Sequence, residues 1–307
     1  MKILRDHQYA APADKGASVA IGNFDGVHRG HQHVLNLAKR LDAPLGVVTF
    51  EPHPRQVFAP DAPPFRLMNA EARANRLRKL GVNLLAELPF DTRLKSLSDV
   101  EFVRDVLVAS LGISHAVVGA DFRFGKDRTG SADTLKQMGA EYGFDVTIAD
   151  LLEGETGAVS STAIRTALTE GRPADAAAML GHWHRIEGPV LHGEKRGREL
   201  GYPTANMGLD GLHVPKPGVY AVTVDVRDGP HAGSYGAVAN LGFRPMFELE
   251  QPNLETYLFD FAGDLYGAHL SVGLVAYLRG EMKFDSLQDL IAQMDMDSLA
   301  ARAALRG

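Results

Sequence analysis

The chain has 307 residues, of which 45% are hydrophobic and 23% charged, and its formal net charge is -6 at pH 7. This length exceeds what one hydrophobic core usually serves, and the composition excludes a disordered or fibrous protein, so two globular domains are expected. The acidic balance, with a pI near 6.1, gives no basic surface for a nucleic-acid backbone or an anionic membrane, so small molecules are the expected partners.

Two further features of the composition concern the cellular location. The chain contains no Cys, which excludes disulfides, thiolate metal sites and a cysteine nucleophile and is typical of a protein in a reducing compartment. The first residues become charged before the apolar core of a signal peptide could form, and no later apolar run approaches membrane-spanning length. We therefore expect a cytoplasmic protein.

In the first half of the chain, short β-rich runs alternate with segments of helical period. Five runs are predominantly apolar, as strands buried on both faces should be: residues 19–21, 46–50, 83–86, 115–118 and 146–148. One helical segment between them is expected to bury a face made of Val34, Leu37, Ala38 and Leu41, and another begins at a capping box of Ser98 and Glu101. This alternation predicts an α/β domain with a Rossmann-like parallel sheet and crossover helices.

The sequence pattern changes after an Ala-rich stretch at residues 173–180, which predicts a short helix with Pro173 in its first turn. We place the domain boundary there, with one domain at residues 1–181 and the other at 182–307. Beyond it, Gly and Pro turns separate four β-rich runs at residues 219–226, 237–241, 255–261 and 270–278. They predict a small antiparallel β-barrel, and an amphipathic C-terminal helix capped by Ser286 is expected to close one of its ends.

A glycine-rich turn follows the first buried strand directly and comprises Gly22, Asn23, Phe24, Asp25 and Gly26. Ligands of a parallel sheet bind at the carboxyl ends of its strands, where such a turn and a helix N-terminus direct N–H groups at an anion. His28 and His31 lie three residues apart on one side of the first helical turn, where their ring N–H groups can stabilise charge on a phosphoryl group. We predict that this turn binds phosphates.

Two alternatives remain for these residues. A glycine-rich turn or a single histidine is by itself more often structural than functional. The four residues His28, His31, His33 and His53 could instead hold a metal ion, but they lack the i, i+4 histidine pair with an adjacent Glu that helical zinc hydrolases use. Phosphate binding is therefore the preferred interpretation.

The segment at residues 22–31 resembles the histidine-bearing signature of the nucleotidyltransferase superfamily, whose members attack the α-phosphate of a nucleotide and release pyrophosphate. A second segment, with Ser160, Ser161, Thr162 and Arg165, is similar to the late Ser-Ser-Thr-x-x-Arg element of that superfamily. The resemblance places it at a helix N-terminus over the triphosphate of ATP, where hydroxyls, N–H groups and a guanidinium would clamp an anion. The alternative is that Ser161 or Thr162 only caps a helix and Arg165 is a solvated surface charge.

Two more segments follow predicted strands directly and put aromatic residues beside turns, where their rings could stack on a planar ligand. One contains Phe50, Pro52 and His53, and the other contains Asp121 and Phe124. Both resemble elements of the bacterial bifunctional riboflavin kinase and FAD synthetase family, which implies flavin or nucleotide binding. Taken alone, each could equally be a packed loop.

The second domain opens with a segment at residues 196–206 that closely resembles the riboflavin kinase signature. It contains Gly201, Pro203, Thr204 and Asn206, and the resemblance implies that Thr204 and Asn206 bind Mg²⁺ and the phosphates of ATP. Oxygen ligands suit this hard cation. From the residue types alone, a simple turn before a strand is the favoured interpretation.

Residues 253–261 are similar to the kinase strand that carries the catalytic carboxylate of the family, which corresponds to Glu255. A carboxylate can take the proton of a primary alcohol as that oxygen attacks the γ-phosphate. An outward-facing surface role for Glu255 is the alternative. The chain departs from the family where Pro-Thr-Phe is replaced by Pro245, Met246 and Phe247, so a hydroxyl near the kinase site is lost.

Together these resemblances imply a bifunctional enzyme. The β-barrel domain would phosphorylate riboflavin with ATP to give FMN, and the α/β domain would transfer AMP from a second ATP to FMN, giving FAD and pyrophosphate, with Mg²⁺ in both steps. His28, His31, Arg165 and Glu255 would be the catalytic residues. A monofunctional FMN adenylyltransferase with a degenerate kinase domain and a non-catalytic flavin-binding protein are the two alternatives, and the sequence leaves the oligomeric state open.

Overall fold

The fold is described from a computed structural model that covers residues 1–5, 10–150, 153–154, 157–192, 202–246 and 249–306. The chain divides into two compact units. The first comprises Met1–Pro63 and Arg73–Val159, and the second comprises Pro64–Ala72 and Ser160–Gly307.

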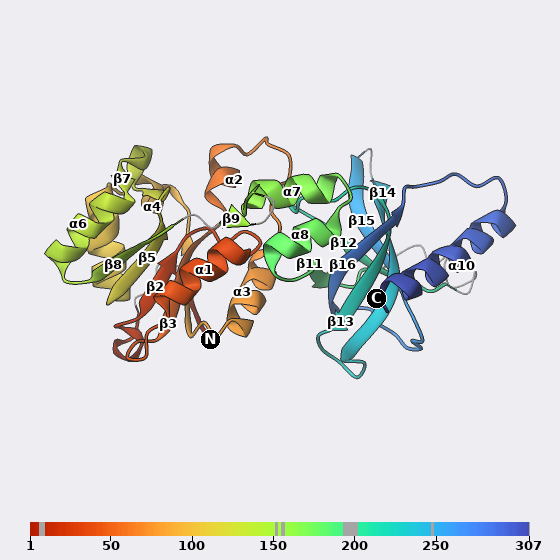
Figure 1. The fold of residues 1–307 in the computed structure, drawn as a ribbon, viewed down its shortest axis with the longest axis horizontal. Coiled ribbons are helices and arrows are strands. Elements are labelled where there is room, and N and C mark those ends of the chain that lie inside the picture. Colours follow the sequence, from red (N-terminus) through yellow and green to blue (C-terminus); the bar gives the residue numbers. More distant parts are fainter. Residues whose placement is uncertain (6–9, 151–152, 155–156, 193–201, 247–248, 307) are drawn as a thin grey trace. The chain divides into compact units, whose positions relative to one another are not determined.

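A six-stranded parallel sheet forms the centre of the first unit (Figure 1). Its strand order is β1 (Lys2–Leu4), β4 (Leu84–Pro89), β3 (Leu45–Glu51), β2 (Ser18–Ile21), β5 (His115–Gly119) and β8 (Asp145–Ala149), with every neighbouring pair parallel. The predicted α/β class is confirmed. The chain moves from β2 toward β3 and β4 on one side and from β5 to β8 on the other. The strand order therefore reverses between β2 and β5, the place where open parallel sheets bind ligands.

Helices connect these strands, and the bounds of the longer ones are α1 (Arg29–Ala38), α3 (Ala70–Lys79), the π-helical segment η2 (Phe102–Leu111) and α6 (Ala132–Tyr142). Shorter elements are η1 (Pro12–Asp14), α2 (Pro54–Phe58), α4 (Thr92–Ser96), α5 (Asp99–Glu101), η3 (Lys126–Arg128) and the strand pairs β6 (Arg123–Phe124) with β7 (Gly130–Ser131) and β9 (Glu153–Gly154) with β10 (Gly157–Ala158). The predicted capping box is confirmed, because Ser98 and Glu101 each bind the backbone N–H of the other at the start of α5.

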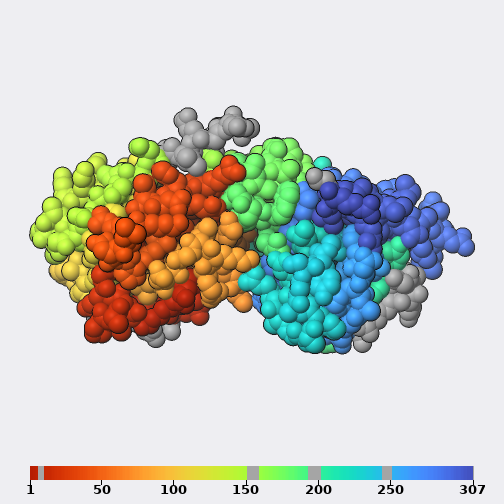
Figure 2. All heavy atoms as spheres, turned by 60° about the horizontal axis from the view of Figure 1, so that its bottom comes forward, coloured from red at the N-terminus to blue at the C-terminus, as the bar shows by residue number. Residues whose placement is uncertain are grey.

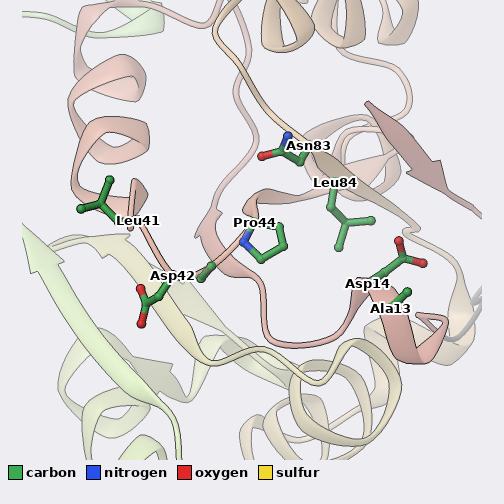
Figure 3. A pocket seen from close by; sticks show the side chains of 8 residues that line it. Ala13, Asp14, Leu41, Asp42, Pro44, Asn83 and Leu84 are labelled. Atoms are coloured by element: carbon green, nitrogen blue, oxygen red, sulfur yellow. The ribbon is translucent and has the colours of Figure 1, made fainter.

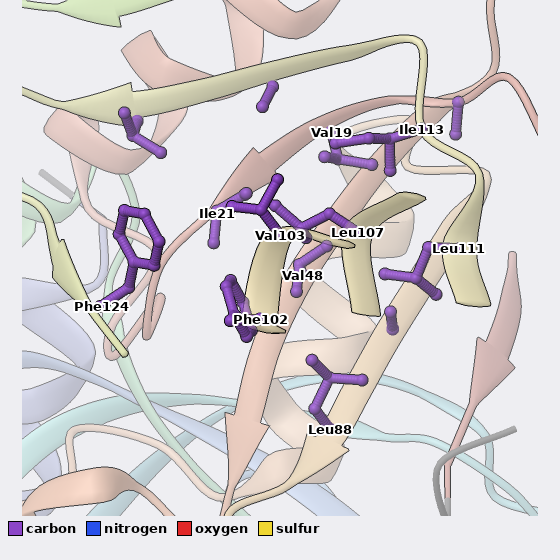
Figure 4. Close-up of a cluster of buried hydrophobic side chains, with 14 of the residues drawn as sticks. Val19, Ile21, Val48, Leu88, Phe102, Val103, Leu107, Leu111, Ile113 and Phe124 are labelled. Carbon is purple, nitrogen blue, oxygen red and sulfur yellow. The ribbon is translucent and has the colours of Figure 1, made fainter. Parts of the chain in front are cut away.

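The buried core of the first unit lies between η2 and the sheet (Figure 4). Phe102, Val103, Leu107 and Leu111 of η2 pack with Val19, Ile21 and Val48 of the central strands. One helical prediction was wrong: α1 buries Leu35 and Ala38, while Leu37 is exposed and Leu41 lies beyond the helix. Lys39 has an extended backbone and ends α1, so the face expected to reach Leu41 does not form.

The second unit contains a six-stranded antiparallel sheet that curves into a nearly closed barrel. Its order is β11 (His184–Pro189), β16 (His269–Arg279), β13 (Gly218–Val226), β14 (Gly233–Met246), β15 (Leu249–Leu258) and β12 (Ala205–Gly208). The amide of Leu191, just past β11, donates to the carbonyl of Asn206 on β12 at 2.8 Å and brings the two edge strands together. The predicted antiparallel barrel is confirmed. Strand β11 was not predicted, β12 begins directly after the turn that the residue types favoured, and β14 is much longer than the expected run.

Among the described residues, three helices accompany the barrel. Helices α7 (Ser161–Thr169) and α8 (Pro173–Leu180) pack together around Ile164, Leu168 and Leu180. The C-terminal helix α10 (Leu287–Ala304) starts at the predicted cap, where Ser286 accepts the amide of Asp289. It lies against the outer face of β13, β14 and β16, on the surface of the unit (Figure 2). Its Ala301 packs with Ala221 and Phe259. The expectation that it closes a barrel end was wrong, because alternate residues of these strands form a second apolar face outside the barrel.

Candidate active sites

The glycine-rich turn follows β2 and is unusually well buried for a loop. Phe24 and Val27 are 1% and 0% exposed, and both have left-handed backbone, with φ of 52° and 46°. A left-handed β-branched residue is strained and persists only where its surroundings hold it. The side-chain amide of Gln32 donates to the Val27 carbonyl at 2.9 Å, which supports the turn from α1. The strained backbone of this turn therefore lowers the stability of the fold, and its surroundings hold the turn in place at the carboxyl ends of the strands.

His28 and His31 are brought together at the start of α1. His28 is the N-cap residue, and its Nδ1 accepts the backbone N–H of His31 at 3.3 Å. The two rings stack with centroids 3.7 Å apart, and the ring of Phe24 lies 5.0 Å from that of His31. Because Nδ1 of His28 accepts, the neutral form of this ring carries its proton on Nε2.

Burial, and then the nearby His28, lower the pKa of His31 well below its ordinary value of 6.5. The Nδ1 atom of His31 is buried and has no hydrogen-bond partner. His31 is thus a neutral imidazole at pH 7, which can donate one hydrogen bond to an anion but does not offer a full positive charge. A buried polar atom without a partner at the mouth of a helix N-terminus suits a site that a ligand completes.

The aromatic segments differ in what their residues contact. Phe50 at the end of β3 is half-buried, with its ring edge-on to Phe90 at 5.8 Å. His53 is buried and caps α2 by accepting the amide of Arg55, and Pro52 before it is exposed. Of the segment after β5, Asp121 is exposed, while Phe124 is buried in the core.

The serine-rich segment and Arg165 lie in the second unit. Ser160, and not Ser161 or Thr162, is the N-cap of α7, since its Oγ accepts the amide of Ala163 at 3.2 Å. The helix N-terminus expected from the resemblance is therefore present. Arg165 is half-buried, and its Nε donates to the carbonyl of Phe65 at 2.6 Å while its guanidinium lies 5.3 Å from the centre of the Phe65 ring. It is anchored and is not a freely solvated charge.

The predicted kinase residues meet on neighbouring strands of the barrel. Asn206 on β12 and Asn240 on β14 flank Glu255 on β15 at the same register. The side-chain amide of Asn253 donates to Glu255 Oε1 and to Asn206 Oδ1, each at 3.4 Å. The Asn206 side chain in turn donates to the Thr204 carbonyl at 3.3 Å. A carboxylate and several amide oxygens thus share one surface of the barrel, next to the half-buried Thr204 and the exposed Pro203.

Further polar residues near this cluster were missed by the sequence analysis. The ring of Tyr202 lies 4.8 Å from that of Tyr257, two residues beyond Glu255, and its hydroxyl donates to Asp295 of α10. Burial and Asp295 raise the pKa of Tyr202 to about 12, so it stays a protonated donor. Residues so far apart in sequence give no local pattern that would reveal their proximity.

Two parts of the predicted kinase site lie outside the described residues. These are Gly201, with the preceding part of its signature, and Phe247. The backbone of Met246 ends β14, where it pairs with Leu249 of β15. The departure from Pro-Thr-Phe therefore falls at the tip of the β14–β15 hairpin.

In the described part of the chain, neither a cluster of metal-binding side chains nor a surface hollow marks the predicted sites. Among the described residues, no group of three or more His, Asp and Glu side chains lies close enough together to hold a metal ion. A hollow of about 530 Å³ is lined by Asp14, Asp42, Pro44 and Asn83 (Figure 3). Pro44 and Asn83 directly precede β3 and β4, so this hollow lies at the amino ends of the strands, opposite the glycine-rich turn. It therefore contains none of the predicted site residues.

A buried histidine outside both sites predicts how the second unit responds to acid. Burial, followed by the charges of His213 and His182, lowers the pKa of His184 on β11 from 6.5 to about 3. Between these values the unfolded chain binds a proton that the folded protein does not, so unfolding becomes easier as the pH falls. From pH 6.5 to pH 5, we expect His184 to remove about 2 kcal/mol of stability.

Urea unfolding followed by the fluorescence of Trp183, the single tryptophan and the neighbour of His184, measures this effect. The His184→Gln variant cannot take up the proton, so its unfolding free energy should depend less on pH than that of the wild type. Equal slopes of stability against pH in the two proteins would contradict the assignment.

None of the helices formed by the described residues is both long enough and apolar enough to span a membrane. The chain matches two families: the FAD synthetase family over residues 10–163 and the riboflavin kinase family over residues 180–305.

Full-length relatives agree with both matches. A bifunctional riboflavin kinase/FMN adenylyltransferase from Pseudomonas fluorescens is 44% identical and covers 99% of this chain and 97% of its own length. The protein of the same name from Escherichia coli K12 is 40% identical and covers 98% and 97%. A solved structure from Streptococcus pneumoniae, described as a macrolide-efflux protein, has a TM-score of 0.83 and 32% identity and covers 98% of both chains.

Proposed function

The chain belongs to the family of bifunctional riboflavin kinases and FMN adenylyltransferases, and we propose that His28, His31, Arg165 and Glu255 are its catalytic residues. The protein is an enzyme of flavin cofactor synthesis that converts riboflavin to FMN and FMN to FAD, with ATP as the second substrate of each step. The single observation that carries the assignment of the two histidines is the stacking of the buried His28 ring on the half-buried His31 ring at a helix N-terminus, beside the strained turn after β2.

In the adenylyl transfer, a phosphate oxygen of FMN attacks the α-phosphorus of ATP, and the bond from that phosphorus to the bridging oxygen breaks to release pyrophosphate. No base is needed, because the phosphate of FMN is already ionised. We assign the ATP phosphates to the turn at residues 22–26 and to Ser160, Ser161 and Thr162, where amide and hydroxyl donors offset their charge. His28 and His31 would donate to oxygens on which charge increases, with Arg165 as the cationic partner.

The remaining assignments of the α/β domain concern the flavin and adenine rings. We assign Phe50, Pro52, His53, Asp121 and Phe124 to the segments that contact them. Of these, Pro52 and Asp121 are exposed and Phe50, near the end of β3, is half-buried, while His53 and Phe124 are buried and would act by shaping the loops.

In the kinase step, the 5′-hydroxyl oxygen of riboflavin attacks the γ-phosphorus of ATP and ADP leaves. We assign to Glu255 the uptake of the hydroxyl proton, for which a carboxylate on an accessible strand surface is the appropriate group. Asn253 donates to one carboxylate oxygen, at 3.4 Å, and so orients the group. Gly201, Pro203, Thr204 and Asn206 would position the phosphates of ATP.

The donor set of the barrel fits Mg²⁺. Asn206 and Glu255 occupy paired positions on adjacent strands, so hard oxygen donors lie within reach of one another, and Thr204 is two residues away. We propose that Thr204 and Asn206 hold the ion in this domain. When bound, Mg²⁺ neutralises charge on the phosphates.

Other properties remain proposals. We propose a domain boundary between residues 181 and 182, a cytoplasmic location, supported by the absence of Cys, and small molecules as partners, in place of nucleic acid or a membrane.

Product analysis by chromatography tests the function directly. Incubation of the purified protein with riboflavin, ATP and Mg²⁺ should yield FMN and FAD, and incubation with FMN, ATP and Mg²⁺ should yield FAD. Removal of Mg²⁺ with EDTA should stop both reactions. FAD from FMN but not from riboflavin would contradict a working kinase and would direct attention to Met246. Flavin binding without any product would contradict both assigned activities.

A further inference from the structure

Arg73 on α3 is an almost completely buried charge that the proposed mechanism does not use. Its side chain is 1% exposed, and its Nη2 donates to Glu51 Oε2 at 2.8 Å and to Glu87 Oε2 at 3.1 Å. Glu87, itself buried, also accepts from Arg5 at 2.9 Å. Burying an arginine is costly, and an ion pair of this kind often stabilises a fold no better than apolar residues would. The pairing alone therefore gives a weak reason for placing Arg73 here.

The other end of the guanidinium reaches the backbone of both predicted ligand turns. Nη1 of Arg73 lies 3.4 Å from the carbonyl oxygen of Asn23 and 3.5 Å from that of Phe50. These carbonyls follow β2 and end β3. The hydroxyl of the fully buried Thr49 donates to the same Asn23 oxygen at 3.2 Å. Two side chains from different elements thus converge on one carbonyl.

The orientation of the Asn23 carbonyl determines whether the turn presents an N–H donor or a carbonyl oxygen to an anion. In a planar trans peptide the C=O and the following N–H point in opposite directions. Because the Asn23 oxygen faces Arg73 and Thr49, the N–H of Phe24 faces away from these interior groups. Phe24 has the left-handed φ of 52°, which costs energy and needs such support. If this peptide were reversed, a carbonyl oxygen would replace an amide donor.

We propose that Thr49 and Arg73 are positioning residues for adenylyl transfer, which hold the Asn23 carbonyl inside the domain so that the turn directs N–H groups at the ATP triphosphate. This proposal rests on the assignment of ATP to residues 22–26. Arg73 also joins this turn to Phe50, so one buried guanidinium sets the backbone of the nucleotide turn and of the adjoining flavin turn.

The decisive variant is Thr49→Val, which removes one hydroxyl and leaves the ion pairs of Arg73 intact. We expect the KM for ATP in FAD formation to rise about fivefold, the effect of one lost hydrogen bond, with little change in the KM for FMN. Thr49→Ser keeps the hydroxyl and should restore the wild-type KM. Arg73→Lys, which keeps the charge but loses the planar fork, should raise the KM for ATP about tenfold.

Matched controls separate positioning from general destabilisation. Thr147→Val removes a hydroxyl of the same sheet that contacts His115 at 2.9 Å, and Arg78→Lys changes an exposed arginine of the same helix. Neither should alter the KM for ATP. Riboflavin phosphorylation, measured on the same full-length preparations, should be unchanged in every variant.

The outcomes distinguish this inference from the proposed function. If His31→Ala lowers FAD formation but Thr49→Val leaves the KM for ATP unchanged, the positioning role is wrong and the ATP site stands. If neither variant affects FAD formation, the assignment of ATP to this turn fails and the positioning role fails with it. Equal increases in the KM for ATP and the KM for FMN after Thr49→Val would also overturn the proposal.

Discussion

Replacing His31 by alanine is expected to lower FAD formation from FMN and ATP by about 10²- to 10³-fold while riboflavin phosphorylation continues at its wild-type rate. The reason is that a fixed donor in a buried site stabilises charge far better than water does. His31 meets this condition, because burial and the stacked His28 keep its ring neutral and lower its pKa well below 6.5. Rates of both reactions should be measured on the same preparation.

His33→Ala is the matched control for this prediction, since His33 lies two residues further along α1. It should leave FAD formation unchanged. If His33→Ala and His31→Ala were equally damaging, the four-histidine metal site would regain support, and phosphate binding by His31 would be contradicted. Since the ring is already neutral at pH 7, the rate of FAD formation should show no decline that reports protonation of His31 between pH 8 and pH 6.5.

The Glu255→Gln variant is expected to lose riboflavin phosphorylation by about 10²- to 10⁴-fold and to keep FAD formation from supplied FMN. Glutamine has the shape of glutamate and retains an oxygen that can accept from Asn253, so the cluster with Asn206 should remain folded. It lacks the basicity needed to take the proton of the riboflavin hydroxyl. Turnover under saturating riboflavin and ATP measures this effect as a change in kcat.

Asp210→Asn provides the control, because it neutralises an exposed carboxylate just beyond β12 without touching Glu255. It should leave both activities near wild type. A kinase that tolerates Glu255→Gln would mean that another group accepts the proton. A simultaneous loss of FAD formation from supplied FMN would mean that the two activities do not reside in independent sites.

Local sequence patterns were sufficient to predict the elements that depend on residues adjacent in the chain. The buried strands β2, β3, β4 and β5 appeared as predominantly apolar runs, because both faces of a parallel sheet are covered. The helix N-caps at Ser98 and Ser286 could be predicted because a capping side chain binds an amide three residues away. The glycine-rich turn was identifiable because its function depends on residues that follow one strand directly.

Features that depend on distant partners were not predictable in this way. β1 is a three-residue edge strand that pairs with β4 alone, too short to show a period. Strand β14 extends to Met246 because β15 pairs with it along the whole hairpin. Helix α10 lies on the outer face of the barrel because neighbouring strands together form an apolar surface there, and no single strand reveals that surface.

The sequence by itself determined the two fold classes and the place of the glycine-rich turn directly after β2, since each depends on residues close together in the chain. Tertiary structure alone decided the environment of those residues. It stacked His28 on His31 and buried the Nδ1 atom of the His31 ring. It also brought Arg73 to Glu51, Glu87 and the Asn23 carbonyl. Burial and charge pairing arise only when segments distant in sequence meet, so the spacing of residues could not predict them.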